Sequence, residues 1–494
     1  MSDDVFLGSA DALSLAIHAR DISCVEVMQA TLDRVDRLNP TFHAIVSRQP
    51  TTDLLRQAAE HDGLLDAGQD LGWMHGFPMA PKDLTDAAGI PTVRGSRLFL
   101  ANVPHADGIQ VQRMRAAGGI VIGKTNTPEH GLGSHTYNDV FGVTRNAWDP
   151  TVSAGGSSGG AAVALALGLL AVADGSDMMG SLRNPAGWNA VYGLRPTPGR
   201  VPSWPVADVF QHQLSTEGPM ARTVSDLARL LSIQAGHDPR LPLSLLDDPQ
   251  RFAEPLTPIG PGVRIGWLGD LEGYLAVEPG VRRVCEQALT SFATVGCEVQ
   301  AAVPFFDHER LWEAWVTLRS FQISGSLSGF YDNAASRAML KPEVCWEIEH
   351  GRARSLQQVF EASLTRTAWH QAVLGAFDRY DVLVLPSAQC APFPAHWTWP
   401  RSVAGRSMDT YHRWMEVVVP GSMAAVPVLC IPAGFDQSGL PAGLQLIGRP
   451  GGEAALMRLA YALDQAVTGE RPVPPAARVG FVPPARQDRA AVPH

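Results

Sequence analysis

Apolar residues recur with helical spacing near the start of the chain. Over residues 8–38 this spacing predicts two amphipathic helices, the second beginning after Ser23. Glu26 stands three positions after Ser23, which is the spacing of a capping box, where two side chains satisfy each other's backbone amides. We expect Asn39-Pro40 to end this helix, because proline lacks the amide that a continuing helix needs.

From about residue 75 to residue 235, short apolar runs alternate with helical patterns. "IQVQRMRAAGG" predicts a helix, "IVIGK" predicts a strand, and an alanine-rich run, Ala161–Ala173, predicts a buried helix too short to span a bilayer. This alternation is typical of α/β architecture around a sheet.

The second half of the chain continues the same alternation. A helix is predicted over 277–295, and residues 303–375 are mainly helical and contain Trp312, Trp315 and Trp346. Further strands are predicted at "RIGWLGD", "CEVQAAVP", "DVLVLPS", "PVLCIPAGF" and "AGLQLIGRP".

Composition restricts the partners. The formal charge of −10 disfavours binding to nucleic-acid backbones or anionic membranes. Six cysteines lie scattered without paired spacing, so we expect reduced thiols. The histidines form no paired ligand motif, so no metal is predicted. The acidic N-terminus has no apolar signal core, which favours a cytoplasmic protein.

The stretch "SAGGSSGGAA", Ser153–Ala162, places two serines between two pairs of glycines. Gly118–Thr125, "GGIVIGKT", fits the phosphate-loop pattern nearby, but its middle residues predict a strand and a helix precedes it, the reverse of a phosphate loop. Gly155–Gly159 also fits the GxSxG nucleophile elbow around Ser157. The residues before it, "NAWDPTVSA", are polar and contain proline, whereas an elbow needs a buried strand there.

A third interpretation combines these serines with two other segments. "DGSDMMGSLRNPA", Asp174–Ala186, contains Ser181, and "HGFPMAPKDLTDAAG", His75–Gly89, contains one lysine, Lys82, in an apolar stretch. Burial lowers the pKa of a lysine, and the neutral amine can then act as a base.

These segments resemble the amidase signature family of serine hydrolases, whose core is GGSSGG followed by a GSIR-like segment. Ser157 and Ser181 stand 24 positions apart, as that pattern requires. The resemblance extends from "DISCVEVMQATLDRVDRLNP" to "IPAGFDQSGLPAGLQLIGRPGGEAALMRLAYAL".

The resemblance implies an α/β fold with a large mixed, mainly parallel central sheet flanked by helices on both faces. It implies a single amidase domain over 1–494. Within it we expect N-terminal helices at 1–65, the catalytic core at 75–235, variable substrate-shaping segments at 303–415, and the C-terminal part of the core at 416–470.

The resemblance also implies residue roles. Ser181 would be the nucleophile, Ser157, preceded by a cis peptide bond in the family, would relay protons, and Lys82 would be the base. Backbone amides of Met178, Met179, Gly180 and Ser181 would form the oxyanion hole. Asp177, Arg183 and Ser158 would support the site. The family usually has glycine where this chain has Met179, so a side chain stands close to that hole.

The implied reaction is hydrolysis of a linear carboxamide, or of a related anilide, carbamate or ester, without a cofactor. Two alternatives remain open: the amidase subunit of a tRNA-dependent amidotransferase, and a catalytically inactive binding homologue. A homodimer is also left open. Aromatic residues of 303–346 and 397–414 predict an apolar or aromatic small-molecule substrate. Trp312 and Trp315 are expected in the core or the pocket lining, and His75 and His130 in structural hydrogen bonds.

Overall fold

The computed structural model describes residues 7–211, 214–302, 305–467 and 471–478. Its N-terminal part contains α2 (Ala10–His18), α3 (Cys24–Phe42) and α4 (Thr51–Asp66). The predicted capping box is present at the start of α3, because the Ser23 amide donates to Glu26 Oε2 at 2.9 Å and the Glu26 amide donates to Ser23 Oγ at 3.1 Å. The two predicted helices over 8–38 are confirmed; residues 1–6 of the predicted N-terminal segment lie outside the described residues.

The prediction that Asn39-Pro40 ends α3 is wrong, since the helix continues through Pro40 to Phe42. Phe42 is fully buried, so the last turn is anchored in the core. The Asn39 side chain accepts hydrogen bonds from the amides of Ala44 and Ile45, both at 2.8 Å. Packing and this side-chain cap outweigh the one hydrogen bond that proline removes so close to the helix end.

The centre of the molecule is a sheet with the strand order β11-β10-β12-β16-β15-β8-β9-β7. Its strands are β7 (Val172–Asp177), β8 (Tyr192–Arg195), β9 (Thr216–Ala221), β10 (Arg264–Trp267), β11 (Glu298–Ala301), β12 (Val382–Pro386), β15 (Val428–Phe435) and β16 (Pro441–Ile447).

The sheet is large and mixed, as predicted, but its strand pairs are mainly antiparallel rather than parallel. Among these described strands, only β10 runs parallel to both its neighbours, β11 and β12. The predicted helix α9 (Pro279–Thr294) makes the crossover between β10 and β11 that a parallel pair needs. By contrast, β15 and β16 are joined by a tight turn closed by the Asp436 amide and the Leu440 carbonyl at 2.9 Å. Such a turn reverses the chain, so these strands pair antiparallel.

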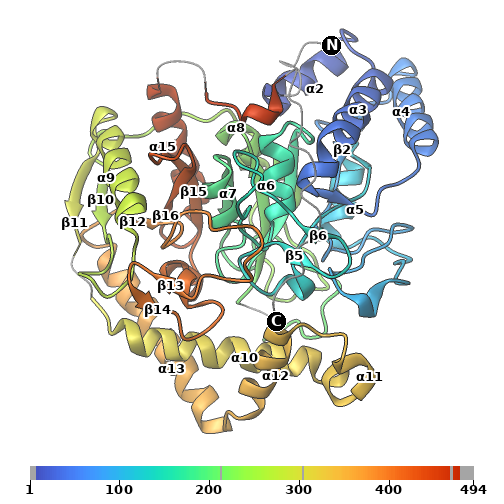
Figure 1. The fold of residues 1–494 in the computed structure, drawn as a ribbon. Helices are drawn as coiled ribbons and strands as arrows, with labels where there is room; N and C mark the ends of the chain where they lie inside the picture. The colour runs from blue at the N-terminus through green and yellow to red at the C-terminus, as the bar shows by residue number, and fades with distance from the viewer. Residues whose placement is uncertain (1–6, 212–213, 303–304, 468–470, 479–494) are drawn as a thin grey trace.

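Both faces of the sheet are covered by helices. Alternate residues of β12 point to opposite faces: Val382 and Val384 belong to one apolar cluster, and Leu383 and Leu385 to another. The first cluster includes α6 (Gly159–Ala166), α8 (Val224–Gln234) and α15 (Glu453–Ala466). The second includes α10 (His308–Asp332) and α13 (Leu356–Ala376), which form a layer along the lower edge of Figure 1 with α11 (Ala334–Arg337) and α12 (Pro342–Arg352).

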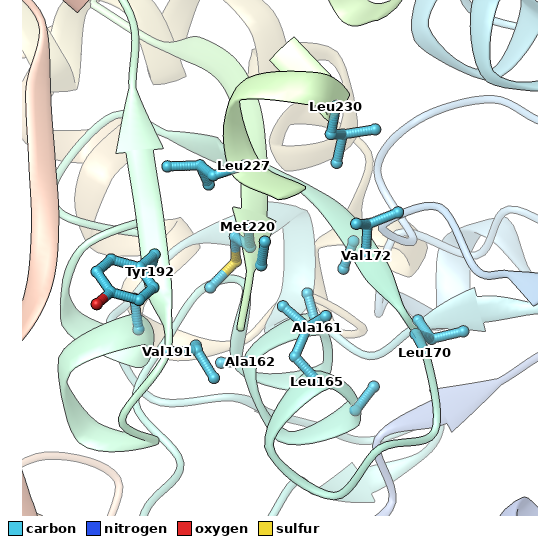
Figure 2. Packing of buried hydrophobic residues seen from close by; sticks show 14 of the residues in the cluster. Ala161, Ala162, Leu165, Leu170, Val172, Val191, Tyr192, Met220, Leu227 and Leu230 are labelled. Carbon is cyan, nitrogen blue, oxygen red and sulfur yellow. The ribbon is translucent and has the colours of Figure 1, made fainter. Parts of the chain in front are cut away.

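Helix α6 is the buried alanine-rich helix that the sequence predicted, but it ends at Ala166 rather than Ala173, since Val172 and Ala173 already belong to β7. Figure 2 shows Ala161, Ala162 and Leu165 of this helix packed among side chains from β7, β9 and α8. Small side chains allow close approach: a Cβ at Gly160 would lie 2.4 Å from the Asn126 amide nitrogen. The glycine–serine loop that precedes α6 is therefore fixed by a helix that has no exposed face.

The remaining elements are short. The pairs are β1 (Ile45–Val46) with β4 (Lys124–Thr125), β2 (Pro78–Met79) with β3 (Ile120–Val121), β5 (Tyr137–Asn138) with β6 (Gly142–Val143), and β13 (Ser402–Val403) with β14 (Arg406–Ser407). Short helices are α5 (Ile109–Ala116), α7 (Asn184–Trp188) and α14 (Val419–Met423). Within the described residues, no helix combines the length and the apolar character needed to cross a membrane.

The Gly118–Thr125 segment is not a phosphate loop. The predicted strand over 120–124 is divided into β3 and β4, and no α-helix follows, since the next element is a short 3-10 turn at Glu129–Gly131. Lys124 is buried, and its ammonium donates to the carbonyl of Thr85.

Candidate active site

The glycine–serine loop lies against two polar side chains at very close range. Gly155 has a φ of +75°, and a Cβ there would lie 2.4 Å from Asn184 Oδ1; at Gly159 it would lie 2.3 Å from Thr136 Oγ1. The Gly156 and Gly159 amides donate to these same oxygens, at 3.1 and 3.2 Å. The Gly156-Ser157 peptide bond is cis. The glycines are thus required where this backbone meets its neighbours.

Lys82 follows β2 and is only 1% exposed. Its Nζ donates to Ser157 Oγ at 2.8 Å, to Ser158 Oγ at 2.9 Å and to Ser176 Oγ at 3.0 Å. Ser158, which was expected to support the site, therefore accepts a hydrogen bond directly from the lysine. Burial lowers the pKa of Lys82 to about 7, against the attraction of nearby carboxylates. Near neutral pH a substantial share of this amine is unprotonated and can accept a proton.

The strand β7 explains how the lysine is held. Because side chains alternate along a strand, Asp174 and Ser176 share one face and Asp177 points to the other. Asp174 accepts the backbone amide of Lys82 at 3.2 Å, and Ser176 accepts from its Nζ. Neither Asp174 nor Ser176 had a role predicted from the sequence, although the alternation of side chains along a strand at "DGSDMMGS" was a signal that could have indicated them.

The loop after β7 is organised by Asp177. Its carboxylate accepts from the amides of Gly180 at 2.8 Å and Leu182 at 3.1 Å, and from Arg183 Nε and Nη2, both at 2.9 Å. Burial alone would raise the pKa of Asp177, but Arg183 and Arg195 lower it to about 2. A fully buried ion pair thus fixes the loop that carries Ser181.

The predicted oxyanion-hole amides differ in their availability. The Gly180 amide is already donated to Asp177. Met179 is 4% exposed; its side chain belongs to an apolar cluster and also reaches the cavity wall beside Met178. The residue that replaces the usual glycine is therefore packed in the core and also lines the cavity.

A cavity of about 250 Å³ opens over Ser157, Ser176 and Ser181. The backbone amide of Ser158 donates to the Ser181 carbonyl at 3.3 Å, which ties the two serine loops together. Among the described residues, no hydrogen bond joins the hydroxyls of Ser157 and Ser181. Hydrogen bonds of this kind are often longer in an empty site and shorten when substrate is bound.

The outer wall of this cavity comes from segments far apart in the chain. Its side chains include Leu84, Asp86, Arg94, His130, Leu132, Trp204, Glu217, Arg319, Gln322, Ile323 and His412. Of these residues only His130 was named in the sequence analysis. Trp204, Glu217, Arg94 and Arg319 lie in segments without a motif, whereas Asp86 lies in the quoted segment that contains Lys82.

The expectations for Trp312, Trp315 and His75 are confirmed, whereas the expectation for His130 is wrong. Trp312 and Trp315 are buried in the cluster under α10 and are absent from the cavity lining, so they are core residues.

His75 makes the expected structural hydrogen bond, since its Nε2 lies 2.9 Å from the His61 carbonyl oxygen. His130, expected to do the same, instead lines the cavity, and its Nε2 has no hydrogen-bond partner among the described residues. Its ring packs edge-on against Phe99 and stacks on Phe330, and these two rings also contact each other.

The described residues contain no group of histidine, cysteine, aspartate and glutamate side chains arranged to hold a metal ion. The six cysteines are unpaired thiols in the described structure, as expected, and five of them are buried. The serine side of this cavity offers hydroxyls, one amine and backbone amides, and the wall adds carboxylate, guanidinium and imidazole groups.

Comparison with known proteins supports the same class. The family model described as Amidase matches residues 26–457. An acylamidase of Rhodococcus erythropolis is 35% identical over 462 residues, covering 92% of this chain and 94% of that protein. A glutamyl-tRNA(Gln) amidotransferase component from Thermosynechococcus vestitus is 34% identical over 472 residues, covering 90% of this chain and 95% of that protein.

A solved structure of a bacterial aryl acylamidase of the amidase signature family matches with a TM-score of 0.87 at 27% identity. The match covers 93% of this chain and 96% of that one. Fold, site and relatives together define a hydrolase that acts on amide bonds. The chain belongs to the amidase family.

Proposed function

We propose that this protein hydrolyses amides through an acyl-enzyme on Ser181, with Ser157 as proton relay and Lys82 as base. One observation carries the proposal: the buried amine of Lys82 lies 2.8 Å from Ser157 Oγ, at a cavity that Ser181 also lines. A buried amine with a lowered pKa is what a hydroxyl nucleophile needs as its base near neutral pH.

The steps follow from the order of these groups. Ser181 Oγ attacks the amide carbonyl carbon, and its proton passes through the Ser157 hydroxyl to the neutral amine of Lys82. The C–N bond then breaks, and the leaving amine takes the proton back along the same path. Water attacks the acyl-enzyme with the same assistance, which releases the carboxylic acid and regenerates Ser181.

The negative oxygen of the tetrahedral intermediate needs amide donors. Met178, Met179 and Ser181 supply the three amides of the predicted hole that Asp177 does not take, whereas the Gly180 amide serves to hold the loop. The buried pair of Asp177 and Arg183 keeps these amides in place before substrate arrives. Such preorganised donors contribute most when they need not move during the reaction.

For the substrate, we propose an acyl amide with an apolar or aromatic group. The relatives support this class, since one is an acylamidase and one structure is an aryl acylamidase. The cavity wall offers Met178, Ile323 and Trp204 as apolar surfaces. Arg319, Ile323 and His412 come from 303–415, which supports a substrate-shaping role for that segment, although residues 303–304 lie outside the described residues.

The experiment is an activity panel with the purified chain alone. Anilides, alkyl amides, carbamates and amino-acid amides are compared, and we expect anilides and apolar acyl amides to be hydrolysed fastest. An amidotransferase subunit would need its partners, and an inactive binding homologue would hydrolyse none of them. Failure with every amide, together with no labelling by a fluorophosphonate, would overturn the proposal.

A further inference from the structure

Glu217 lies on β9 directly opposite Ser176 of β7. Directly paired residues of antiparallel strands point to the same face, with Cβ atoms about 5 Å apart. Ser176 is one of the three hydroxyls that accept hydrogen bonds from Lys82 Nζ. Ser176 therefore stands beside both residues: it accepts a hydrogen bond from the proposed base, Lys82, and it is paired across the strands with Glu217.

The partners of Glu217 differ from those of the other acids near Lys82. Asp177 is neutralised by Arg183, and Asp174 accepts the backbone amide of Lys82. Glu217 Oε1 accepts from the Ser203 hydroxyl at 2.8 Å, and among the described residues Glu217 forms no ion pair. Among the described residues neither Glu217 nor Asp174 is paired with an arginine, so both carboxylates act on Lys82, Asp174 more strongly than Glu217.

Glu217 also separates two cavities. It lines the reaction cavity together with Ser203, Val206 and Ser215, and the same four residues line a second cavity of about 230 Å³. Its carboxyl group can thus exchange protons with water on either side, while Lys82 itself is almost completely enclosed.

We propose that Glu217 is a positioning residue of this site: its carboxylate, held by Ser203 and placed across the strand pair from Ser176, stabilises the ammonium form of Lys82 and sets the pH at which the site becomes active. This inference rests on the proposed function, in which Lys82 is the base. It adds a residue to which neither the family resemblance nor the sequence gave a role.

The charges around the pair are consistent with this role. Burial raises the pKa of Glu217 to about 7, in the same range as that of Lys82. The other ionisable groups whose charges act on one or both of the two are Asp174, Asp177 and Lys124. Asp83 and Asp86 act in turn on Lys124, and Arg183 and Arg195 act on Asp177.

When two groups with similar pKa values interact, their protons are lost in two steps, and the pKa of each step describes the pair and not one residue. As pH rises, the Glu217 carboxylate forms and makes the Lys82 ammonium harder to deprotonate. The amount of neutral Lys82 should therefore increase over a wider pH range than a single group would give, and at higher pH than if the carboxylate were absent.

The test is the pH profile of kcat/KM, and of the rate of fluorophosphonate labelling, for Glu217→Gln. We expect the rising part of this pH profile, here called the limb, to move to lower pH by about one unit. It should also steepen to the slope that the titration of a single group gives. The matched control is Asp86→Asn, which removes another carboxylate of the same cavity wall, one paired with Arg94 at 3.4 Å. This control should leave the limb in place.

A second variant keeps the inference testable if Glu217→Gln does not fold. Ser203→Ala removes the hydroxyl that stabilises the carboxylate, so the charge forms at higher pH and the limb should move to lower pH by a smaller amount. An unmoved limb in the folded variants, or a change in KM alone, would overturn the role of Glu217. Failure of the proposed function would look different, because the limb would then survive in Lys82→Ala.

Discussion

The lysine and the loop carboxylate on one side of the reaction cavity differ from two side chains of its outer wall in how fully they are paired. On the serine side, Lys82 Nζ has three hydroxyl partners and Asp177 has two amides and a guanidinium. On the outer wall, His130 Nε2 and Arg94 Nε have no hydrogen-bond partner among the described residues. A reacting centre needs fixed geometry, and in the proposed function the unpaired atoms of the wall are available to polar groups of the substrate.

The largest expected effect comes from removing a group on the serine side. Ser181→Ala, Ser157→Ala and Lys82→Ala should each lower kcat by about 10³-fold or more, because in the proposed mechanism the three act as one proton-transfer unit. Steady-state kinetics on an anilide would measure this. The Ser181→Ala, Ser157→Ala double variant should be little slower than the slower single variant; losses that multiply would show that the serines act independently.

The next effect concerns the stability of the Ser181 loop. Asp177→Asn leaves the buried guanidinium groups of Arg183 and Arg195 without a carboxylate, which should lower the free energy of unfolding by about 3 kcal/mol or more. Urea unfolding would measure it. The control is Asp381→Asn, at the partly exposed pair with Arg264, where a loss below about 1 kcal/mol is expected. Equal losses of stability in the two variants would contradict the expected difference between the buried and the partly exposed ion pair.

The third prediction is the pH dependence of the reaction. Only neutral Lys82 can take a proton, and its pKa lies at about 7, so kcat/KM should rise with pH and level off above it. For one titrating group, kcat/KM at pH 5 would be about one hundredth of the plateau. A flat profile across this range, measured on a substrate that does not itself titrate, would exclude Lys82 as the base.

The smallest effect is expected on the outer wall. Ile323→Ala enlarges the cavity and should change the ratio of kcat/KM between a large and a small acyl amide by about tenfold. Ile348→Ala is its matched control, since Ile348 belongs to the same apolar cluster but is absent from the cavity lining. That variant should lose stability without changing the ratio. A similar change of ratio in both variants would show that the wall has no specific role.

The two sides also differ in how far the sequence predicts them. Ser157, Ser181 and Lys82 lie in motifs whose spacing is visible along the chain, so their proximity could be expected. The direction of the strands could not, because the pairing of β8, β9 and β15 depends on long-range contacts. Glu217 and Arg319 were missed for the same reason: each reaches the cavity through a strand pairing or a helix position that no local pattern records.

The serine assignment makes the central claim directly measurable. A fluorophosphonate should label the peptide that contains Ser181, and mass spectrometry should find the adduct on that residue. Ser181→Ala should lose the label, whereas Ser157→Ala should keep the adduct site and form it far more slowly. An adduct on Ser157, with Ser181→Ala still labelled, would contradict the proposed mechanism.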